Sequence, residues 1–255
     1  MCSNNNVIPP EPDPYRSARL LLLRTLRTEP LRSNIVLVSI PVLLVIFTYF
    51  GSNDFARRHF FTPETYSDLY GFIYHHLGAF VILGLCSVVL GSVLGFRPRG
   101  LGLGAGDWRF GLKFCAIVIP LLVAPITFAG SHSADVLREY PVSKEALRSG
   151  GAFAMHVAFY LCYYVGWEVF FRGYALFGLI ERMGKWGAIL VQVIPSTVIH
   201  TSIVCAGKPF AETIGAVPVG ILLGWLTVRT RSVWYAFAIH AAIGVLTDVW
   251  IFSKG

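Results

Sequence analysis

The chain has 255 residues, of which 55% are hydrophobic and 14% are charged, and its mean hydropathy is +0.63. This composition excludes a water-soluble globular fold, in which about 25% of residues are charged. The net charge of +7 would suggest nucleic-acid binding in a soluble chain, but here the basic residues flank apolar stretches, as they do beside membrane spans. The sequence therefore predicts an all-α, polytopic transmembrane bundle that contacts the lipid bilayer and binds no nucleic acid.

The first 33 residues are polar, with a Pro-rich stretch followed by arginines and a run of leucines at 20–23. This pattern fits a short helix on an anionic membrane surface or a disordered tail that ends in a basic juxtamembrane segment. Cys2 follows Met1 directly, so we do not expect it to belong to a lipoprotein signal, which needs an apolar region before the cysteine. We expect residues 1–33 to form a cytoplasmic basic tail that is partly disordered.

Apolar stretches bounded by charged or turn residues predict about seven membrane spans. They cover residues 34–50, 71–96, 111–130, 151–180, 186–205, 211–228 and 233–252. We assign residues 34–94 to N-terminal transmembrane helices and residues 95–252 to a membrane-embedded core. The five cysteines contain no CxxC pair, so neither a disulfide framework nor a zinc knuckle is indicated.

The basic residues are distributed unevenly between the two sides of the predicted bundle. Of the 21 lysines and arginines, two thirds lie in the N-terminal tail and in the connecting segments on the same side as this tail. Because positive residues are retained in the cytoplasm, seven crossings place the N-terminus in the cytoplasm and the C-terminus outside.

Glu168 and Arg172 are informative because both lie within an apolar stretch. A charged group in the middle of a bilayer is costly unless it faces the protein interior and finds a partner. The two residues are four apart, so a helix places them on one face, where they can form an ion pair. Such a pair could serve only to stabilise the bundle, but apolar side chains would do so more easily; we therefore interpret it as part of a site.

Two histidines lie in other predicted spans. His200 follows Pro195, which kinks or loosens its helix, and His240 precedes Asp248 by about two helical turns, on a similar face. Either histidine alone would be an ordinary contact between helices, but two of them together with the Glu/Arg pair indicate a polar site.

Glu212 follows a short turn and would lie close in depth to His200 if the fifth and sixth spans form a hairpin. It could equally be an acid that stabilises the N-terminus of a helix. The remaining histidines are left out of the site, because His75 and His76 lie near the end of a span, where interfacial water solvates them, and His156 lies about 120° around the helix from Glu168.

These residues suit the hydrolysis of an amide bond. A carboxylate in apolar surroundings can act as a general base toward water and then as an acid toward a leaving amine. Histidines can position the water or stabilise the oxyanion. The sequence lacks GxSxG, HExxH and a cysteine beside a histidine, which are the usual signatures of serine, zincin and cysteine proteases.

At these positions the chain resembles the CPBP family of CAAX proteases and bacteriocin-processing proteins, whose eukaryotic relatives are the type II CAAX prenyl endopeptidases. The family pattern is EExxxR on one helix, FxxxH on a second and HxxxN on a third. The matching segments here are WEVFFR at 167–172, SxxxH at 196–200 and HxxxG at 240–244, and the resemblance covers roughly residues 95–252.

Three positions depart from this pattern: Trp167 replaces the first Glu, Ser196 the Phe and Gly244 the Asn. In the family the first Glu is the catalytic carboxylate and the second supports it, so Trp167 leaves Glu168 to act alone. The segments GKPFAE and HxxxxxxxD look like a WE-type branch of bacterial members, in which Glu212 and Asp248 restore the missing acidic function.

The resemblance implies an intramembrane endopeptidase that cleaves a membrane-anchored or lipid-linked protein near its terminus by glutamate-assisted attack of water. The catalytic candidates carried over are Glu168, Arg172, His200 and His240, with Glu212 and Asp248 as supporting candidates. The bacterial branch implies the inner membrane of a bacterium. No cofactor is expected; zinc could be held by the two histidines and a carboxylate, but their spacing is not a metal signature.

Two other functions fit the same charged residues. The cluster could be the structural or partner-binding core of a non-catalytic CPBP-like scaffold or immunity protein. It could also be the proton relay of a proton-coupled transporter, although transport would favour inverted repeats, and none is visible in the sequence.

Overall fold

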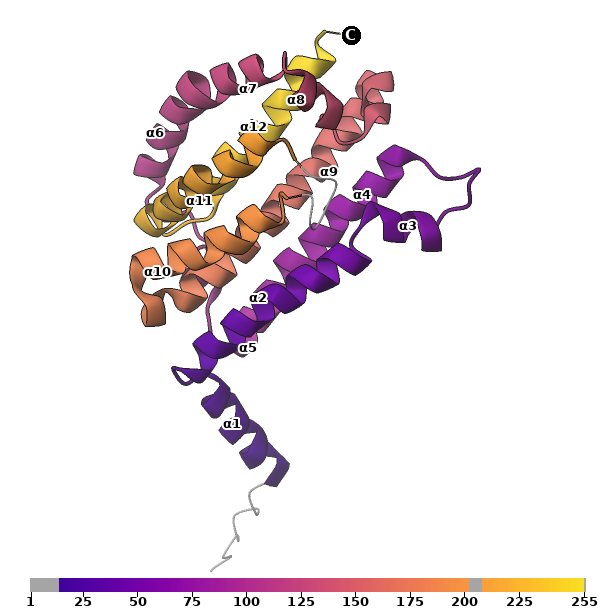
Figure 1. Ribbon diagram of the computed structural model, residues 1–255. Coiled ribbons are helices and arrows are strands. Elements are labelled where there is room, and N and C mark those ends of the chain that lie inside the picture. The colour runs from indigo at the N-terminus through magenta and orange to yellow at the C-terminus, as the bar shows by residue number, and fades with distance from the viewer. Residues whose placement is uncertain (1–13, 202–207, 255) are drawn as a thin grey trace, which may run out of the picture.

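The computed structural model describes residues 14–201 and 208–254, which form a helical bundle (Figure 1). All regular secondary structure in these ranges is helical, which confirms the predicted all-α fold class. The elements in chain order are α1 (Pro14–Leu26), α2 (Leu31–Phe50), α3 (Asn53–His59), α4 (Asp68–Gly78), η1 (Ala79–Leu85), α5 (Cys86–Val93), η2 (Pro98–Leu101), α6 (Trp108–Val118), η3 (Ile119–Val123), α7 (Ala124–Gly130), α8 (Ala134–Glu139), η4 (Lys144–Arg148), α9 (Gly150–Glu168), η5 (Val169–Ala175), α10 (Leu176–Val198), α11 (Phe210–Thr230) and α12 (Trp234–Phe252).

Within residues 14–201 and 208–254, five helical segments are long and apolar enough to cross a bilayer. They are Leu31–Phe50, Asp68–Val93, Trp108–Gly130, Phe210–Thr230 and Trp234–Phe252, and each coincides with an expected span. The other two expected spans, 151–180 and 186–205, fall on α9, η5, α10 and the three residues after α10, and positions 202–205 of the second lie outside the described residues. The chain is thus built as an integral membrane protein, while the count of seven spans stays a prediction.

The N-terminal helix α1 lies apart from the bundle, at the end of α2 (Figure 1). Its leucines at positions 20, 21 and 22 are 52%, 67% and 59% exposed. A helix is therefore present in the expected basic tail, with an apolar surface that the bundle does not cover; residues 1–13 of that tail lie outside the described residues.

The centre of the bundle is η5 with the first turn of α10. Phe170, Phe171, Tyr174 and Leu176 have no exposed surface and pack in one core with residues of α2, η1 and α10. A helix that is apolar on all sides must be surrounded by protein or lipid, and here other helices surround it. Glu168 and Arg172, which flank the start of this segment, are consequently shielded from solvent.

A glycine interrupts α10 and reverses the direction of the chain. Gly184 has φ +68° and ψ 172°, a conformation that glycine adopts at no steric cost. The second half of α10 therefore folds back and packs along α11, which brings the end of α10 toward the end of α9. This placement carries His200 into the neighbourhood of Trp167.

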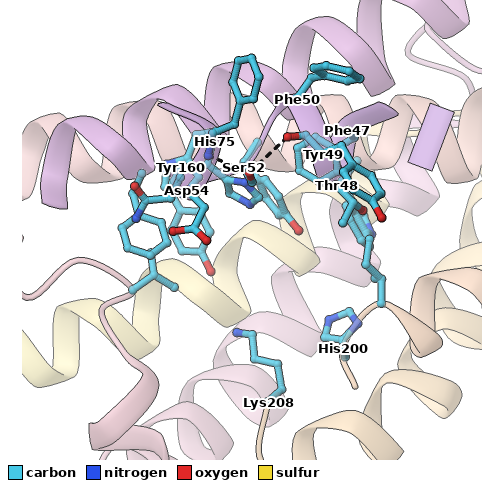
Figure 2. Close-up of a pocket in the computed structure, with 18 of the residues that line it drawn as sticks. Phe47, Thr48, Tyr49, Phe50, Ser52, Asp54, His75, Tyr160, His200 and Lys208 are labelled. Atoms are coloured by element: carbon cyan, nitrogen blue, oxygen red, sulfur yellow. Dashed lines mark hydrogen bonds between the residues drawn. The ribbon is translucent and has the colours of Figure 1, made fainter. Parts of the chain in front are cut away.

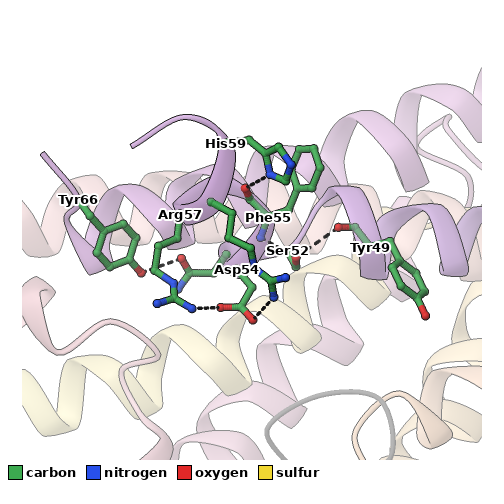
Figure 3. A network of polar contacts seen from close by, with 9 residues as sticks. Tyr49, Ser52, Asp54, Phe55, Arg57, His59 and Tyr66 are labelled. Atoms are coloured by element: carbon green, nitrogen blue, oxygen red, sulfur yellow. Dashed lines mark hydrogen bonds and ion pairs between the residues drawn. The ribbon is translucent and has the colours of Figure 1, made fainter. Parts of the chain in front are cut away.

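A short polar helix, α3, lies at the end of α2 and α4 (Figure 3). Ser52 caps it by accepting a hydrogen bond from the backbone N–H of Phe55 at 3.1 Å. Arg57 and Arg58 donate to the two carboxylate oxygens of Asp54 at 2.9 and 3.1 Å, and these hydrogen bonds lower the pKa of Asp54 below its usual value. The end of the bundle beside α3 thus presents paired charges.

Glycines allow α9 to touch η1 closely. A Cβ built on Gly84 would lie 2.9 Å from the Cα of Gly166, and a Cβ on Gly166 would lie 2.5 Å from the carbonyl oxygen of Ala79. Real Cβ atoms essentially never come this near backbone atoms. The two helices therefore depend on Gly166 for their separation.

We expect Gly166→Ala to lower the free energy of unfolding by about 1–3 kcal/mol, because overpacking forces the two helix backbones apart. Thermal unfolding in detergent would measure the change. Gly151→Ala is the matched control on the same helix, since its Cβ would meet only the Ser149 hydroxyl at 4.0 Å. Equal stability of the two variants would contradict the close packing.

Candidate active site

The carboxylate of Glu168 is the centre of the site. Glu168 ends α9 and has no exposed surface. The Nδ1–H of His240, on α12, donates a hydrogen bond to its Oε1 at 2.6 Å. Because the two residues are 72 positions apart in sequence, only the packing of α9 against α12 brings them together.

Arg172 supplies the positive charge beside this carboxylate. Its Nη1 lies 3.3 Å from Oε1 of Glu168, and its side chain is 3% exposed. The pair is within ion-pair distance, but Nη1 and Nε of Arg172 and Oε2 of Glu168 have no hydrogen-bond partner among the described residues. The expected ion pair is present, and part of its hydrogen-bonding capacity remains unused.

A cavity of about 290 Å³ lies beside the pair. Of the catalytic and supporting candidates, Arg172, His200, Glu212 and His240 line it. Glu168 is not among the lining residues, because His240 and Arg172 cover its carboxylate. The cavity is therefore in contact with the buried carboxylate only through its two partners.

His200 follows the end of α10, in a different segment of the chain from Glu168 and His240. Its Nδ1–H donates to the carbonyl oxygen of Ser196 at 2.6 Å, so Nε2 is the ring nitrogen that is free to accept a hydrogen bond. The ring stands edge-on to Trp167, with the centroids 6.1 Å apart. His200 and His240, from separate segments, thus line one cavity, and Glu168 is linked to it through its hydrogen bond with His240.

Glu212 approaches the cavity from the first turn of α11. Its Oε1 accepts a hydrogen bond from the Tyr140 hydroxyl at 2.6 Å and lies 3.1 Å from Nζ of Lys208. Burial raises the pKa of Tyr140 well above its usual value, and the charge of Glu212 adds to the effect. Tyr140 therefore stays protonated and holds Glu212 in place.

Asp248 lies away from this cavity. Its Oδ2 accepts a hydrogen bond from Nε2–H of His156 at 2.9 Å, and both side chains are fully buried. His76 is 2% exposed and stacks on Tyr160, with ring centroids 5.0 Å apart. The interpretation that interfacial water solvates His76 was wrong, because α9 and the loop before it cover that end of α4.

The sequence did not identify His156 as the partner of Asp248, and the spacing of residues on α9 explains why. His156, Tyr160, Tyr164 and Glu168 are each four residues apart, and such a row forms a ridge along which packed helices meet. On a single ideal helix, a row of residues four apart winds slowly around the axis. His156 and Glu168, at the two ends of this row, therefore point in different directions. The four-residue spacing that links His156 to Glu168 was the feature of the sequence that could have identified it.

Gly244 leaves space for one of these ridge residues. A Cβ at this position would lie 1.8 Å from the Tyr164 hydroxyl and 3.0 Å from that of Tyr160. The ring of Tyr164 also lies 4.8 Å from that of His240. No side chain, and hence no Asn of the HxxxN pattern, fits at position 244 while Tyr164 keeps this place.

Trp167, which replaces the first Glu of the pattern, is 2% exposed and packs on Tyr163 at 5.4 Å between ring centroids. It lines the cavity and also a larger groove of about 900 Å³ between α9 and the α2–α4 region. Figure 2 shows His200 and Lys208 on one side of this groove and Phe47, His75 and Tyr160 on the other. Position 167 therefore faces the site, whereas Glu168 does not.

No group of three or more His, Cys, Asp or Glu side chains that could hold a metal ion occurs in residues 14–201 and 208–254. His200 is bonded to a backbone carbonyl and His240 to Glu168. The zinc site considered from the sequence thus has no preformed ligand set in this part of the chain.

Comparison with known proteins gave one family. Residues 148–246 match the Rce1-like family, described as type II CAAX prenyl endopeptidase Rce1-like. This match confirms the resemblance over that segment, which contains Glu168, Arg172, His200, Glu212 and His240 but ends before Asp248. No curated protein and no solved structure matches the chain. The matched family is a protease family, which supports an enzyme of the CAAX-protease type in this integral membrane chain.

Proposed function

We propose that the chain is an intramembrane endopeptidase that cleaves a membrane-anchored or lipid-linked protein near its terminus by glutamate-assisted attack of water. The observation that carries the proposal is the 2.6 Å hydrogen bond from His240, a residue of the cavity wall, to the buried carboxylate of Glu168. The enzyme would act in the inner membrane of a bacterium, with its N-terminus in the cytoplasm.

Glu168 would act through His240. When Nδ1–H is donated to the carboxylate, Nε2 of the imidazole keeps its lone pair and can take a proton from water. The carboxylate holds the ring in this tautomer and stabilises the imidazolium that forms, as the acid of a catalytic triad does. His240 would then return the proton to the leaving amine.

Arg172 and His200 would complete the reaction geometry. Arg172 lines the cavity, and a positively charged guanidinium beside the reacting carbonyl would stabilise a developing oxyanion. His200 has its Nδ1–H bonded to Ser196, so Nε2 can accept a hydrogen bond from water and position it.

Glu212 is the supporting carboxylate that the geometry favours. It lines the cavity, whereas Asp248 is paired with His156 outside it. We therefore assign to Glu212 the acidic function that Trp167 removes and to Asp248 a role in holding α12 against α9.

The two carboxylates can be separated by matched amide variants. We expect Glu212→Gln to reduce substrate processing by about 10-fold or more at unchanged abundance, because positioned acid–base groups contribute about 10²–10⁴-fold. Asp248→Asn should lower abundance, because it weakens a buried pair, while processing per folded molecule stays unchanged. The assay follows co-expressed membrane-anchored substrates by immunoblot, with the enzyme level measured alongside; the reverse pattern would exchange the two roles.

A further inference from the structure

The candidate site has two cavities that share one wall. The smaller cavity of about 290 Å³ is lined by the catalytic candidates Arg172, His200 and His240, and the larger groove measures about 900 Å³. Trp167 and His200 line both, and no other described residue does. These volumes stand near the lower and upper ends of the range of ligand pockets, about 300–1,000 Å³.

Aromatic and imidazole side chains line much of the groove. Phe47, Phe72, His75, Tyr160 and Tyr163 form much of its wall. Such rings pack against bulky apolar and aromatic side chains by offset or edge-to-face contacts.

The charged residues that line the groove are of both signs: Asp54, Arg58, Arg138, Glu139 and Lys208. Arg58 lies 3.1 Å from Asp54, and Lys208 lies 3.1 Å from Glu212. Because acidic and basic groups are mixed along the lining, the groove does not select for an occupant of one charge.

The smaller cavity has a different lining. Gly215, Ala216 and Gly220 of α11 form one wall, and Val118 and Leu122 of α6 and η3 lie opposite. Apart from the candidate site residues, Thr127 and Ser196, the space is apolar, and its size limits a side chain that enters it. It favours a small apolar residue.

Trp167 is held rigidly between the two spaces. Its indole is stacked on Tyr163 with an interplanar angle of 25°, packs on Phe171 at 4.7 Å between centroids, and meets the edge of His200. A side chain with this many ring contacts and 2% exposure has little freedom to rotate away. It therefore forms a fixed part of the wall between the groove and the cavity.

We propose that Trp167 is a specificity-determining residue of the endopeptidase. A substrate polypeptide places a bulky apolar or aromatic side chain in the groove, passes Trp167, and presents a small apolar side chain to the cavity, with the scissile bond at His200 and His240. This proposal rests on the proposed endopeptidase function and adds the side-chain classes that are accepted on the two sides of the scissile bond.

The partition can be tested without any activity. Ala216→Cys places a thiol in the cavity and Thr48→Cys places one in the groove, and each is labelled in purified full-length protein with N-ethylmaleimide or with the bulkier fluorescein maleimide. Site-resolved mass spectrometry separates the introduced cysteine from the native ones. We expect the bulky reagent to label Ala216→Cys at least 10-fold more slowly than the small one, and Trp167→Leu to remove this difference.

Two controls sharpen this result. Thr48→Cys should label at the same rate with and without Trp167→Leu, and Trp186→Leu, which changes a tryptophan that is 56% exposed, should leave all rates unchanged. Trp167→Phe, which keeps a ring and disturbs folding less, should give an intermediate rate at Ala216→Cys. Equal access of both reagents to the cavity in the parent, or no effect of either Trp167 variant, would overturn the partition.

The cleavage test uses a pool of co-expressed membrane-anchored substrates that vary on both sides of the scissile bond. We expect the parent to prefer a small residue on the cavity side, and Trp167→Leu to shift the kcat/KM ratio of bulky to small residues there by at least 10-fold, within the range for pocket discrimination. An unchanged ratio would refute the specificity role. Cleavage that persists in Glu168→Gln would instead refute the proposed function. The labelling result does not depend on cleavage, so it would still hold.

Discussion

Glu168→Gln is expected to reduce processing of a membrane-anchored substrate by about 10²–10⁴-fold, the usual contribution of a positioned general acid–base group. The amide keeps the size of the side chain, and its oxygen can still accept the hydrogen bond from His240. It cannot stabilise a positive charge on the imidazole, so His240 loses its ability to take a proton from water. The measurement is the ratio of cleaved to uncleaved substrate, normalised to the amount of folded enzyme.

The matched control is Glu181→Gln, which makes the same chemical change at a carboxylate that is 61% exposed and pairs with Arg32 at the surface. It should process substrate like the parent. Combining Glu168→Gln with Glu212→Gln should add little further loss, because residues that act as one unit are not additive. If both single variants and the double variant processed substrate normally, the charged cluster would be a structural scaffold.

Arg172→Ala should lower the free energy of unfolding by roughly 3–5 kcal/mol, because it leaves the buried carboxylate of Glu168 without a compensating charge. The side chain of Glu168 has no exposed surface, so water cannot replace the lost cation. Lower abundance in membranes and a lower thermal unfolding temperature in detergent would both report the change.

A double variant distinguishes the ion pair from simple loss of packing. Glu168→Gln in the Arg172→Ala background removes the unpaired charge and should recover part of the lost stability, although not the activity. Arg182→Ala is the control on α10, since Arg182 bonds to Asn34 and Pro30 at an exposed position and should tolerate the change. Normal accumulation of Arg172→Ala would show that the pair contributes nothing to the bundle.

The helical membrane architecture follows from the sequence alone, because a bilayer imposes a simple constraint. A span needs about 20 apolar residues in which every backbone group is bonded within the helix, so hydropathy locates it without knowledge of its neighbours. The five apolar segments coincide with expected spans for this reason. The ion pair of Glu168 and Arg172 was predictable in the same way, because a spacing of four residues on one helix is a local property.

The contacts between helices were decided by the tertiary structure. Glu168 meets His240 and His156 meets Asp248 across the same pair of helices, but sequence spacing does not show how α9 packs along α12 or that Tyr164 fits against Gly244. A helical wheel describes one helix in isolation, whereas the ridge of residues that contacts a neighbour depends on how the two helices cross. The sequence thus determined which charged groups needed a partner inside the membrane, and the packing of the helices determined which partner each one found and which of them face a cavity.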